Sequence, residues 1–469
     1  MKTHPHPPPQ RPRKLPAQEA KPIPARAVSA ARATTPATFE ITPARAAAFE
    51  ILTLVGESKG HSDELLHSHR TAALSPEDRN LATALVMGVL RWQIALDARI
   101  AKLLARPGQR LAEPVAIALR MGALQLLKMD RIPAHAALSE SVELCRSSGQ
   151  PHATGMVNAI LRKLAAAQPA GKRIFESPAA FAERLAHPLW LVDRWIAAHG
   201  RDAALAICEY DQHEPHAGGL FPEGVPHADA DPIPPSNTAP QMDDGSRLIA
   251  ELAVATIPAT QDRAPRVWDC CAAPGGKTLH LARRLPAAEI FATDISARRL
   301  TQMTARLRHY LYAHSIRCAV ADASAPTTDP QGPFDLILCD VPCSGTGTLA
   351  RNPEIRLRLR PEDLTPHAQR QRAILSGALR RLAPGGRLLY STCSLEPEEN
   401  QRVVEAVIPN HAVRQLPIAP FIGQLGDSGI LQPEVSARLL NTAIVDGALR
   451  TLPGTHPCDG FYATLLERK

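Results

Sequence analysis

Apolar residues in the first part of the chain recur at intervals of three and four positions, the spacing of helices that bury one face. One helix is expected to open at Pro43 with Thr42 as its N-cap, and Ser75 is the expected N-cap of another. This periodicity predicts an all-α domain over residues 39–168. The expected helices cover residues 43–55, 79–104, 112–129, 134–146 and 155–163.

From residue 246 onward the pattern changes, because short apolar runs now alternate with amphipathic helical stretches. This alternation predicts a doubly wound, Rossmann-like α/β domain over residues 241–469, closed by an antiparallel pair of strands at 448–452 and 461–466. The expected parallel strands are 266–270, 289–294, 316–320, 334–340 and 387–392, and the helices are 277–285, 297–312 and 365–382.

Two stretches lack a regular pattern. Residues 1–38 are basic and rich in proline, which predicts a disordered tail or a loose electrostatic attraction to RNA phosphates. Residues 169–240 contain one helical stretch at 190–198, followed by a part rich in Pro, Gly and Asp. We interpret this second stretch as a linker or a reduced subdomain.

A glycine-rich turn, Asp269-Cys-Cys-Ala-Ala-Pro-Gly-Gly-Lys-Thr278, follows the first expected strand. Its end is similar to a phosphate-binding P-loop, but Cys271 stands where that loop needs glycine, which disfavours a nucleoside triphosphatase. Gly275 and Gly276 permit close approach of a ligand to the backbone. Asp294, Asp322 and Asp340 lie at or near the ends of later strands. Such carboxylates at one edge of a sheet predict a nucleoside cofactor, with Asp294 on the ribose and Asp322 near the adenine.

Two cysteines follow strands directly, Cys343 in Asp340-Val-Pro-Cys-Ser-Gly and Cys393 in Ser391-Thr-Cys-Ser. Since the carboxyl ends of parallel strands meet at one edge, both thiols are expected in one crevice. A thiolate adds to electron-poor carbons such as C6 of cytosine, which makes C5 able to accept a methyl group. Cys393, Cys343 and Asp340 are the candidate catalytic residues. Inert core cysteines are the alternative, and we assign that role to Cys145, Cys208, Cys318 and Cys339.

Composition adds a weak indication of an anionic partner, because the net charge is +7 and the pI is about 9.0. Arginines after the Cys343 turn, together with one in the helical domain, are candidate RNA contacts, with a solvated basic face as the alternative. The nine cysteines form no CxxC, so we expect neither a disulfide framework nor a metal site, and a reducing cytoplasm suits them. We expect no membrane span. The candidate arginines are Arg351, Arg356, Arg358 and Arg162.

The three motifs around Asp269, Cys343 and Cys393 together resemble the RNA cytosine-C5 methyltransferases, which use S-adenosylmethionine. Gly155-Met-Val-Asn-Ala-Ile-Leu-Arg and the stretch from Ala134 resemble the NusB-like RNA-binding fold. A NusB-like domain ahead of such a catalytic domain resembles the bacterial 16S rRNA methyltransferases of the Sun/Fmu type. The same chemistry on tRNA, and a ribosome-assembly factor with secondary activity, are the alternatives.

The resemblance implies roles for individual residues. It makes Cys393 the nucleophile that bonds to C6 and gives Cys343 the task of assisting product release. It implies a cytoplasmic enzyme, expected as a monomer, whose partner is 16S rRNA, free or in an assembly intermediate. The implied cofactor contacts are Cys271, Ala272, Ala273, Pro274, Gly275, Gly276, Lys277, Asp294, Asp322 and Asp340.

Overall fold

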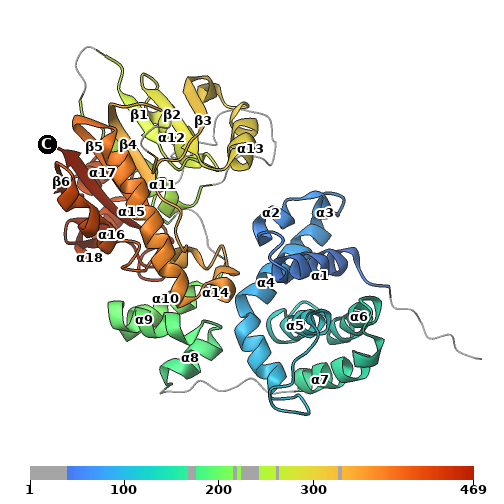
Figure 1. Cartoon of the computed structure of the whole chain (residues 1–469). Helices are drawn as coiled ribbons and strands as arrows, with labels where there is room; N and C mark the ends of the chain where they lie inside the picture. Colours follow the sequence, from blue (N-terminus) through green and yellow to red (C-terminus); the bar gives the residue numbers. More distant parts are fainter. Residues whose placement is uncertain (1–39, 167–175, 215–218, 223–241, 260–262, 326–329) are drawn as a thin grey trace, which may run out of the picture. The chain divides into compact units, whose positions relative to one another are not determined.

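The computed structural model describes residues 40–166, 176–214, 219–222, 242–259, 263–325 and 330–469 (Figure 1). The tail predicted over residues 1–38 and most of the proline-rich part of the predicted linker lie outside the described residues.

The first described part is all-α, as predicted. Ser75 caps α4, because its hydroxyl accepts the N–H of Asp78 at 3.1 Å, and a proline opens α1 directly after Thr42. Apolar residues of the long helices, such as Ile51, Leu85 and Leu119, form one core. The helices are α1 Pro43–Gly56, α2 Ser62–Leu66, α3 His69–Ala72, α4 Pro76–Ala101, α5 Glu113–Lys128, α6 Ala134–Ser147 and α7 Thr154–Ala166.

Within the described residues, α4 is long and apolar enough to cross a membrane by length and composition. The expectation of no membrane span stays a prediction. The apolar side chains of α4, among them Leu85, Val86 and Val89, lie in the core of the helical domain. A core helix passes the same test of length and composition, so the finding is weak support for a membrane span.

The second part contains one mixed sheet in the order β3-β2-β1-β4-β5-β9-β8-β7, with β6 paired to β9. Strands β1 to β5 are parallel and β9 runs antiparallel to β5, which confirms the predicted doubly wound domain with an antiparallel end. The strands are β1 Arg266–Asp269, β2 Glu289–Asp294, β3 Ile316–Val320, β4 Phe334–Asp340, β5 Leu382–Thr392, β6 Val413–Leu416, β7 Ile444–Val445, β8 Ala448–Arg450 and β9 Tyr462–Arg468.

Helices cover both faces of this sheet, and Figure 1 shows α15 lying across it. One face packs Val267, Leu336 and Leu389 in a core shared with α11, α12, α17 and α18, and the other packs Trp268, Ile337 and Tyr390 with α15 and α16. The helices are α11 Asp244–Ala255, α12 Gly276–Arg284, α13 Ala297–Leu307, α14 Ile355–Arg358, α15 Leu364–Arg380, α16 Gln401–Val407, α17 Ala419–Asp427 and α18 Pro433–Thr442.

Part of the predicted linker is folded. Helices α8 Pro178–Arg184, α9 Leu189–His199 and α10 Arg201–Tyr210 share a small core around Trp195. Leu349 and Leu395, one from each cysteine-bearing turn, pack in the same core. These three helices therefore support the turns that follow β4 and β5. The boundaries that we assigned to the domains stay a prediction.

Candidate active site

The structure brings the two strand-end thiols into contact. Cys343 follows β4 and Cys393 follows β5, and these neighbouring parallel strands pair Asp340 with Ser391 at their ends. The Sγ atoms of Cys343 and Cys393 lie 3.4 Å apart. The expected common crevice is thus a direct consequence of the sheet order.

The two thiols lie in different electrostatic surroundings. The contact with Cys393 and burial, with a further contribution from the charge of Glu399, raise the pKa of Cys343 well above its ordinary value. Lys277 lies 2.8 Å from Asp340 and its side chain is 17% exposed. Burial opposes the charged form of Lys277, but Asp340, Asp243 and Cys393 together raise its pKa. The site therefore combines a protonated thiol at Cys343 with a positive charge near Cys393.

A cavity of about 200 Å³ adjoins the Lys277–Asp340 ion pair. Gly275, at φ +105°, must be glycine, because a Cβ there would also lie 2.8 Å from Cγ of Met303. Most of the predicted cofactor residues line the cavity, and four residues outside that prediction join them. The lining residues are Met242, Asp243, Ser246, Asp269, Cys271, Ala272, Ala273, Pro274, Gly276, Lys277 and Asp340.

Asp294 and Asp322 are not among the lining residues. Asp294 ends β2, accepts the N–H of Ser296 at 2.8 Å, and lies 3.3 Å from Arg299. Asp322 accepts the N–H and the hydroxyl of Ser324. Both carboxylates are therefore engaged with neighbouring residues, and their cofactor roles stay predictions.

The residues at this edge fit S-adenosylmethionine by their chemistry. Asp294 offers an acceptor for ribose hydroxyls, and Ile295 beside it is an apolar side chain that is 69% exposed. Asp243, Lys277 and Asp340 offer charges of both signs to an amino-acid group. Burial raises the pKa of Asp269 to about 7, while the hydroxyl of Thr278 donates to it at 2.6 Å. Asp269 therefore supports the turn beneath the cavity.

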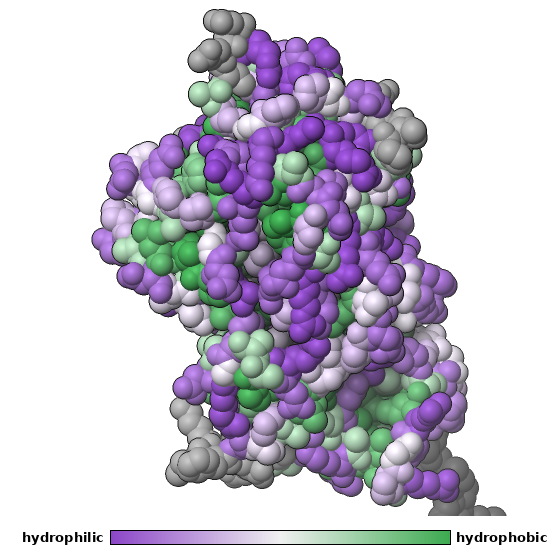
Figure 2. Space-filling model, turned by 60° about the vertical axis from the view of Figure 1, so that its left-hand side comes forward, coloured by the Kyte–Doolittle hydropathy of each residue, from purple (hydrophilic) through white to green (hydrophobic). Residues whose placement is uncertain are grey.

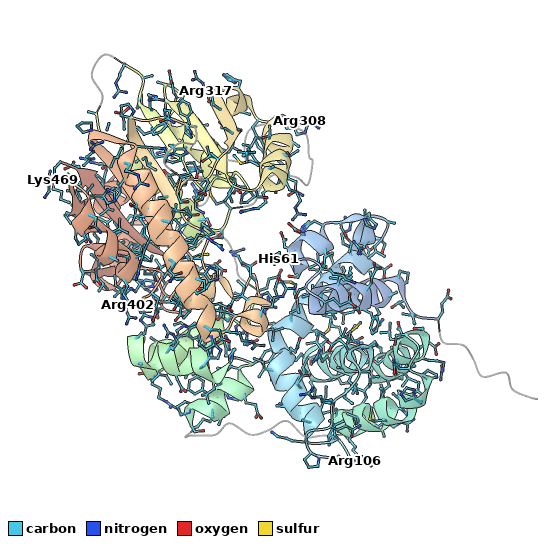
Figure 3. The ribbon with its side chains drawn as sticks, viewed as in Figure 1. His61, Arg106, Arg308, Arg317, Arg402 and Lys469 are labelled. Carbon is cyan, nitrogen blue, oxygen red and sulfur yellow. The ribbon has the colours of Figure 1, made fainter. Side chains whose placement is uncertain are left out.

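A larger cavity of about 340 Å³ lies at the β1–β3 end of the sheet. Arg266, Phe291 and Arg317 line it together with neighbouring residues, and neither thiol is among them. Figure 3 labels Arg317 there and Arg308 just beyond the end of α13. Neither thiol lines the smaller cavity either, but Asp340, one of the three candidate catalytic residues, does.

The arginines predicted to bind RNA after the Cys343 turn have other partners in the structure. Arg356 is 1% exposed, and its guanidinium donates to main-chain carbonyls of Arg91, Ala186, Asp211 and Leu349. Arg358 donates to the carbonyls of Val55 and Gly60. The buried guanidinium of Arg356 stabilises contacts between distant segments, so the structure contradicts an RNA contact there, whereas Arg358 is partly exposed and its RNA contact stays a prediction.

The other two candidate arginines also stay open to RNA. Arg351 is partly exposed and pairs with Asp459 at 2.7 Å. Burial, together with the charge of Asp243, raises the pKa of Asp459 to about 7, although Arg351 lowers it. Arg162 lies exposed on α7 and donates to Asn158 at 3.2 Å. RNA contact by either residue stays a prediction.

Sequence reasoning missed Glu399, a fully buried carboxylate that contacts both cysteine turns. It also missed Glu396, which accepts from Arg194 and from the indole N–H of Trp195 on α9. The acidic run Glu396-Pro-Glu-Glu399 directly after Cys393 was the available signal, since buried carboxylates need partners. Among the described residues, no group of three or more His, Cys, Asp or Glu is placed to hold a metal ion.

Surface character adds little to this picture. The face in Figure 2 is largely hydrophilic with smaller hydrophobic areas between. In the described part of the chain, the exposed large apolar residues are Leu189, Ile295, Val320, Leu440 and Val445.

Two family models match the chain, the 16S rRNA methyltransferase RsmB/F model over residues 255–467 and the NusB family model over residues 42–166. Ribosomal RNA small subunit methyltransferase B of Xanthomonas campestris is 34% identical over 460 residues, which cover 90% of this chain and 96% of the relative. The same protein of Vibrio vulnificus is 30% identical, with 91% of this chain and 99% of the relative covered.

The crystal structure of PH0851 shares the fold, with a TM-score of 0.64 and 22% identity over 92% of this chain and 100% of that one. The chain therefore belongs to the RsmB/F family of 16S rRNA methyltransferases, with a NusB domain ahead of its catalytic domain and S-adenosylmethionine as its cofactor.

Proposed function

We propose that this RNA methyltransferase methylates C5 of a cytosine in 16S rRNA through a covalent bond between Cys393 and C6. The observation that supports this most is the 3.4 Å contact between Cys343 and Cys393, which follow the paired strand ends at Asp340 and Ser391. Two thiols at one crevice suit a reaction in which one sulfur bonds to the base and the other assists its release.

The steps balance as follows. The thiolate of Cys393 adds to C6, so an S–C6 bond forms and the electron pair of the C5=C6 bond moves toward C5. S-adenosylmethionine, when bound, would supply a methyl group on a positively charged sulfur, which would keep the electron pair of the broken S–CH3 bond and leave as a neutral thioether. After C5 has taken the methyl group, a base removes the C5 proton. The pair from that C–H bond restores C5=C6 while the S–C6 bond breaks and Cys393 leaves as a thiolate.

The surroundings of the thiols support this division of labour. Two causes of the raised pKa of Cys343 are its hydrogen bond with Cys393 and the negative charge that Cys393 carries as a thiolate. Both causes end once Cys393 is bound to C6. Burial and Glu399 still raise the pKa of Cys343, but the thiol can then lose its proton more easily than before, which supports its assignment as the base that takes the C5 proton.

Asp340 is suited to orient the pyrimidine. Its carboxylate accepts the hydroxyl of Ser391 at 2.7 Å and lies 2.8 Å from Lys277. A carboxylate fixed in this way can accept a hydrogen bond from the N4 amino group of cytosine. Uracil lacks this amino group. This contact would also place C5 toward the cofactor cavity, since Asp340 lines it.

The identity of the RNA comes from the relatives, whose names specify the small ribosomal subunit. We extend that substrate to this chain, which we expect to act as a cytoplasmic monomer on 16S rRNA, free or in an assembly intermediate. Arg162 and Arg351 are the candidate phosphate contacts.

The test is transfer of a labelled methyl group from S-adenosylmethionine to 16S rRNA, with tRNA as a comparison substrate. We expect Cys393→Ala to abolish transfer, because its thiolate activates C5, while calorimetry shows unchanged cofactor binding. Cys318→Ala, on β3, is the matched control and should retain full activity. Bisulfite sequencing should find the methyl group on a cytosine. Substantial methylation by Cys393→Ala would overturn the covalent mechanism.

A further inference from the structure

We propose that Glu399 is a positioning residue for the two thiols. Its carboxylate binds the serine that follows each cysteine and thereby fixes one turn against the other. This inference rests on the proposed function, because it assumes that both thiols act on the same base.

The contacts of Glu399 reach both turns. Oε1 accepts the main-chain N–H of Ser344 at 2.9 Å, and Oε2 accepts the hydroxyls of Ser344 and of Ser394, the latter at 2.5 Å. The two hydroxyls also lie 3.0 Å from each other. Ser344 directly follows Cys343, and Ser394 directly follows Cys393. All three residues are buried, so water does not compete for these bonds.

Gln371, on α15, supplies the fourth hydrogen-bond donor to Glu399. Nε2 of Gln371 donates to Oε1 of Glu399 at 2.9 Å and also to the carbonyl of Pro342 at 3.0 Å. An ionised carboxylate only accepts, at about four lone-pair sites, so four donors fill its capacity. A side chain that must also donate would not match this set of donors equally well.

Glu399 is itself fixed by its neighbours. The hydroxyl of Tyr390, on β5, donates to the carbonyl of Glu399 at 2.6 Å. Asn400 accepts the hydroxyl of Thr392 at 2.5 Å and donates to the carbonyl of Ser394 at 2.8 Å. The segment after Cys393 therefore folds back on its own strand, which places the carboxylate against the two serines that follow the cysteines.

The reaction makes this position important. Adjacent strands of a sheet lie about 4.8 Å apart, and turns that leave their ends are free to diverge unless something joins them. Cys393 must reach C6 while Cys343 serves the neighbouring atom, C5. A displacement of about 1 Å in such an arrangement can reduce the rate on the order of 100-fold. A shared acceptor between the two turns limits that displacement.

The first test measures thiol position without any RNA. Diamide, a mild oxidant that takes two hydrogens from two thiols, converts close pairs into disulfides, and mass spectrometry follows the peptide that joins Cys343 to Cys393. We expect Ser344→Ala, Ser394→Ala and Glu399→Ala to form this link at least about fivefold more slowly than the unaltered protein, because wider separation reduces the encounter of the sulfurs. Ser436→Ala removes a buried serine whose hydroxyl bonds to Ile422, and as the control it should leave the rate unchanged.

The second test measures kcat and KM for 16S rRNA. We expect Ser344→Ala and Ser394→Ala to lower kcat about tenfold while KM and cofactor affinity stay within about twofold, because positioning acts on the reacting atoms. Glu399→Ala should lower kcat further than either serine variant. Glu399→Gln, which keeps one acceptor oxygen, should lower kcat less than Glu399→Ala does. The two serine variants keep the test decisive if Glu399→Ala fails to fold.

The outcomes separate the two proposals. Unchanged cross-linking in Ser344→Ala and Ser394→Ala overturns the positioning role, as does slower cross-linking with an unchanged kcat. Equal losses in Glu399→Gln and Glu399→Ala also overturn it, since charge rather than hydrogen bonding would then dominate. Retained methylation in Cys393→Ala overturns the proposed function instead, and leaves the cross-linking result standing.

Discussion

The turn that carries Cys343 and the turn that carries Cys393 are stabilised from different sides. The chain after Cys343 contacts the helical domain, because Arg91 donates to the carbonyl of Ala350 and Ser62 donates to Glu354. The chain after Cys393 folds back onto its own strand through Asn400. The thiol expected to assist release is thus connected to the NusB domain, while the turn of the expected nucleophile is held by its own strand and, through Glu396, by α9.

The helical domain therefore also stabilises the chain that follows Cys343 in the catalytic domain. Glu354 is buried and accepts the N–H and the hydroxyl of Ser62, and His61, labelled in Figure 3, lies 3.8 Å away. Arg358 depends on carbonyls of α1 and of the chain after it. Two buried polar side chains of the α/β domain, Glu354 and Arg356, therefore have hydrogen-bond partners in the helical domain.

The largest predicted effect is the difference between the Cys343→Ala and Cys393→Ala variants. We expect Cys343→Ala to add to the base and methylate it but to stall at release, which lowers turnover on the order of 100-fold or more. A denaturing gel should show a shifted protein band that RNase removes. Cys393→Ala should show no such band, because it cannot bond to C6. The reverse pattern would exchange the roles of the two turns.

The next largest predicted effect concerns the hydrogen bonds that Arg356, in the chain after Cys343, makes with distant segments. We expect Arg356→Ala to lower the free energy of unfolding by about 2–4 kcal/mol, because it leaves buried carbonyls without a donor. Urea denaturation measures this loss. Arg372→Ala, at an exposed position of α15, is the control and should change stability by less than about 0.5 kcal/mol. Similar losses in both variants would contradict the structural role of Arg356.

Asp294 lies apart from both turns, so its substitution isolates cofactor binding. We expect Asp294→Ala to weaken S-adenosylmethionine binding by about 1.5–3 kcal/mol, the range for hydrogen bonds to a charged group. Calorimetry on the RNA-free protein is the measurement, and Asp427→Ala, exposed at the end of α17, is the control. Cross-linking of the two thiols should not change. An unaltered dissociation constant would move the ribose contact to another residue.

The sequence predicted the sheet and the meeting of the thiols, because both follow from local patterns. Fully buried strands such as β4 are continuous apolar runs, and parallel strands end at one edge. The roles of Arg356 and Glu399 could not be predicted in this way. Their partners are main-chain carbonyls and serines that only the folded chain brings near them. The helices α8 to α10 were missed in part because they are short and proline interrupts the pattern.

The smallest predicted effects are losses of stability at two contacts that α2 makes with the catalytic domain. Ser62 donates to buried Glu354, whereas Glu64 pairs with Arg298 at 3.2 Å, with exposed fractions of 46% and 69%. We expect Ser62→Ala to cost about 1–2 kcal/mol of stability, because a buried carboxylate loses a donor. Glu64→Ala should cost at most about 0.5 kcal/mol, since water screens an exposed ion pair. Urea denaturation at low and high salt distinguishes the two, because only the Glu64 effect should vanish with salt. A larger loss from Glu64→Ala than from Ser62→Ala would mean that surface charge, rather than buried hydrogen bonding, dominates the contact of α2 with the catalytic domain.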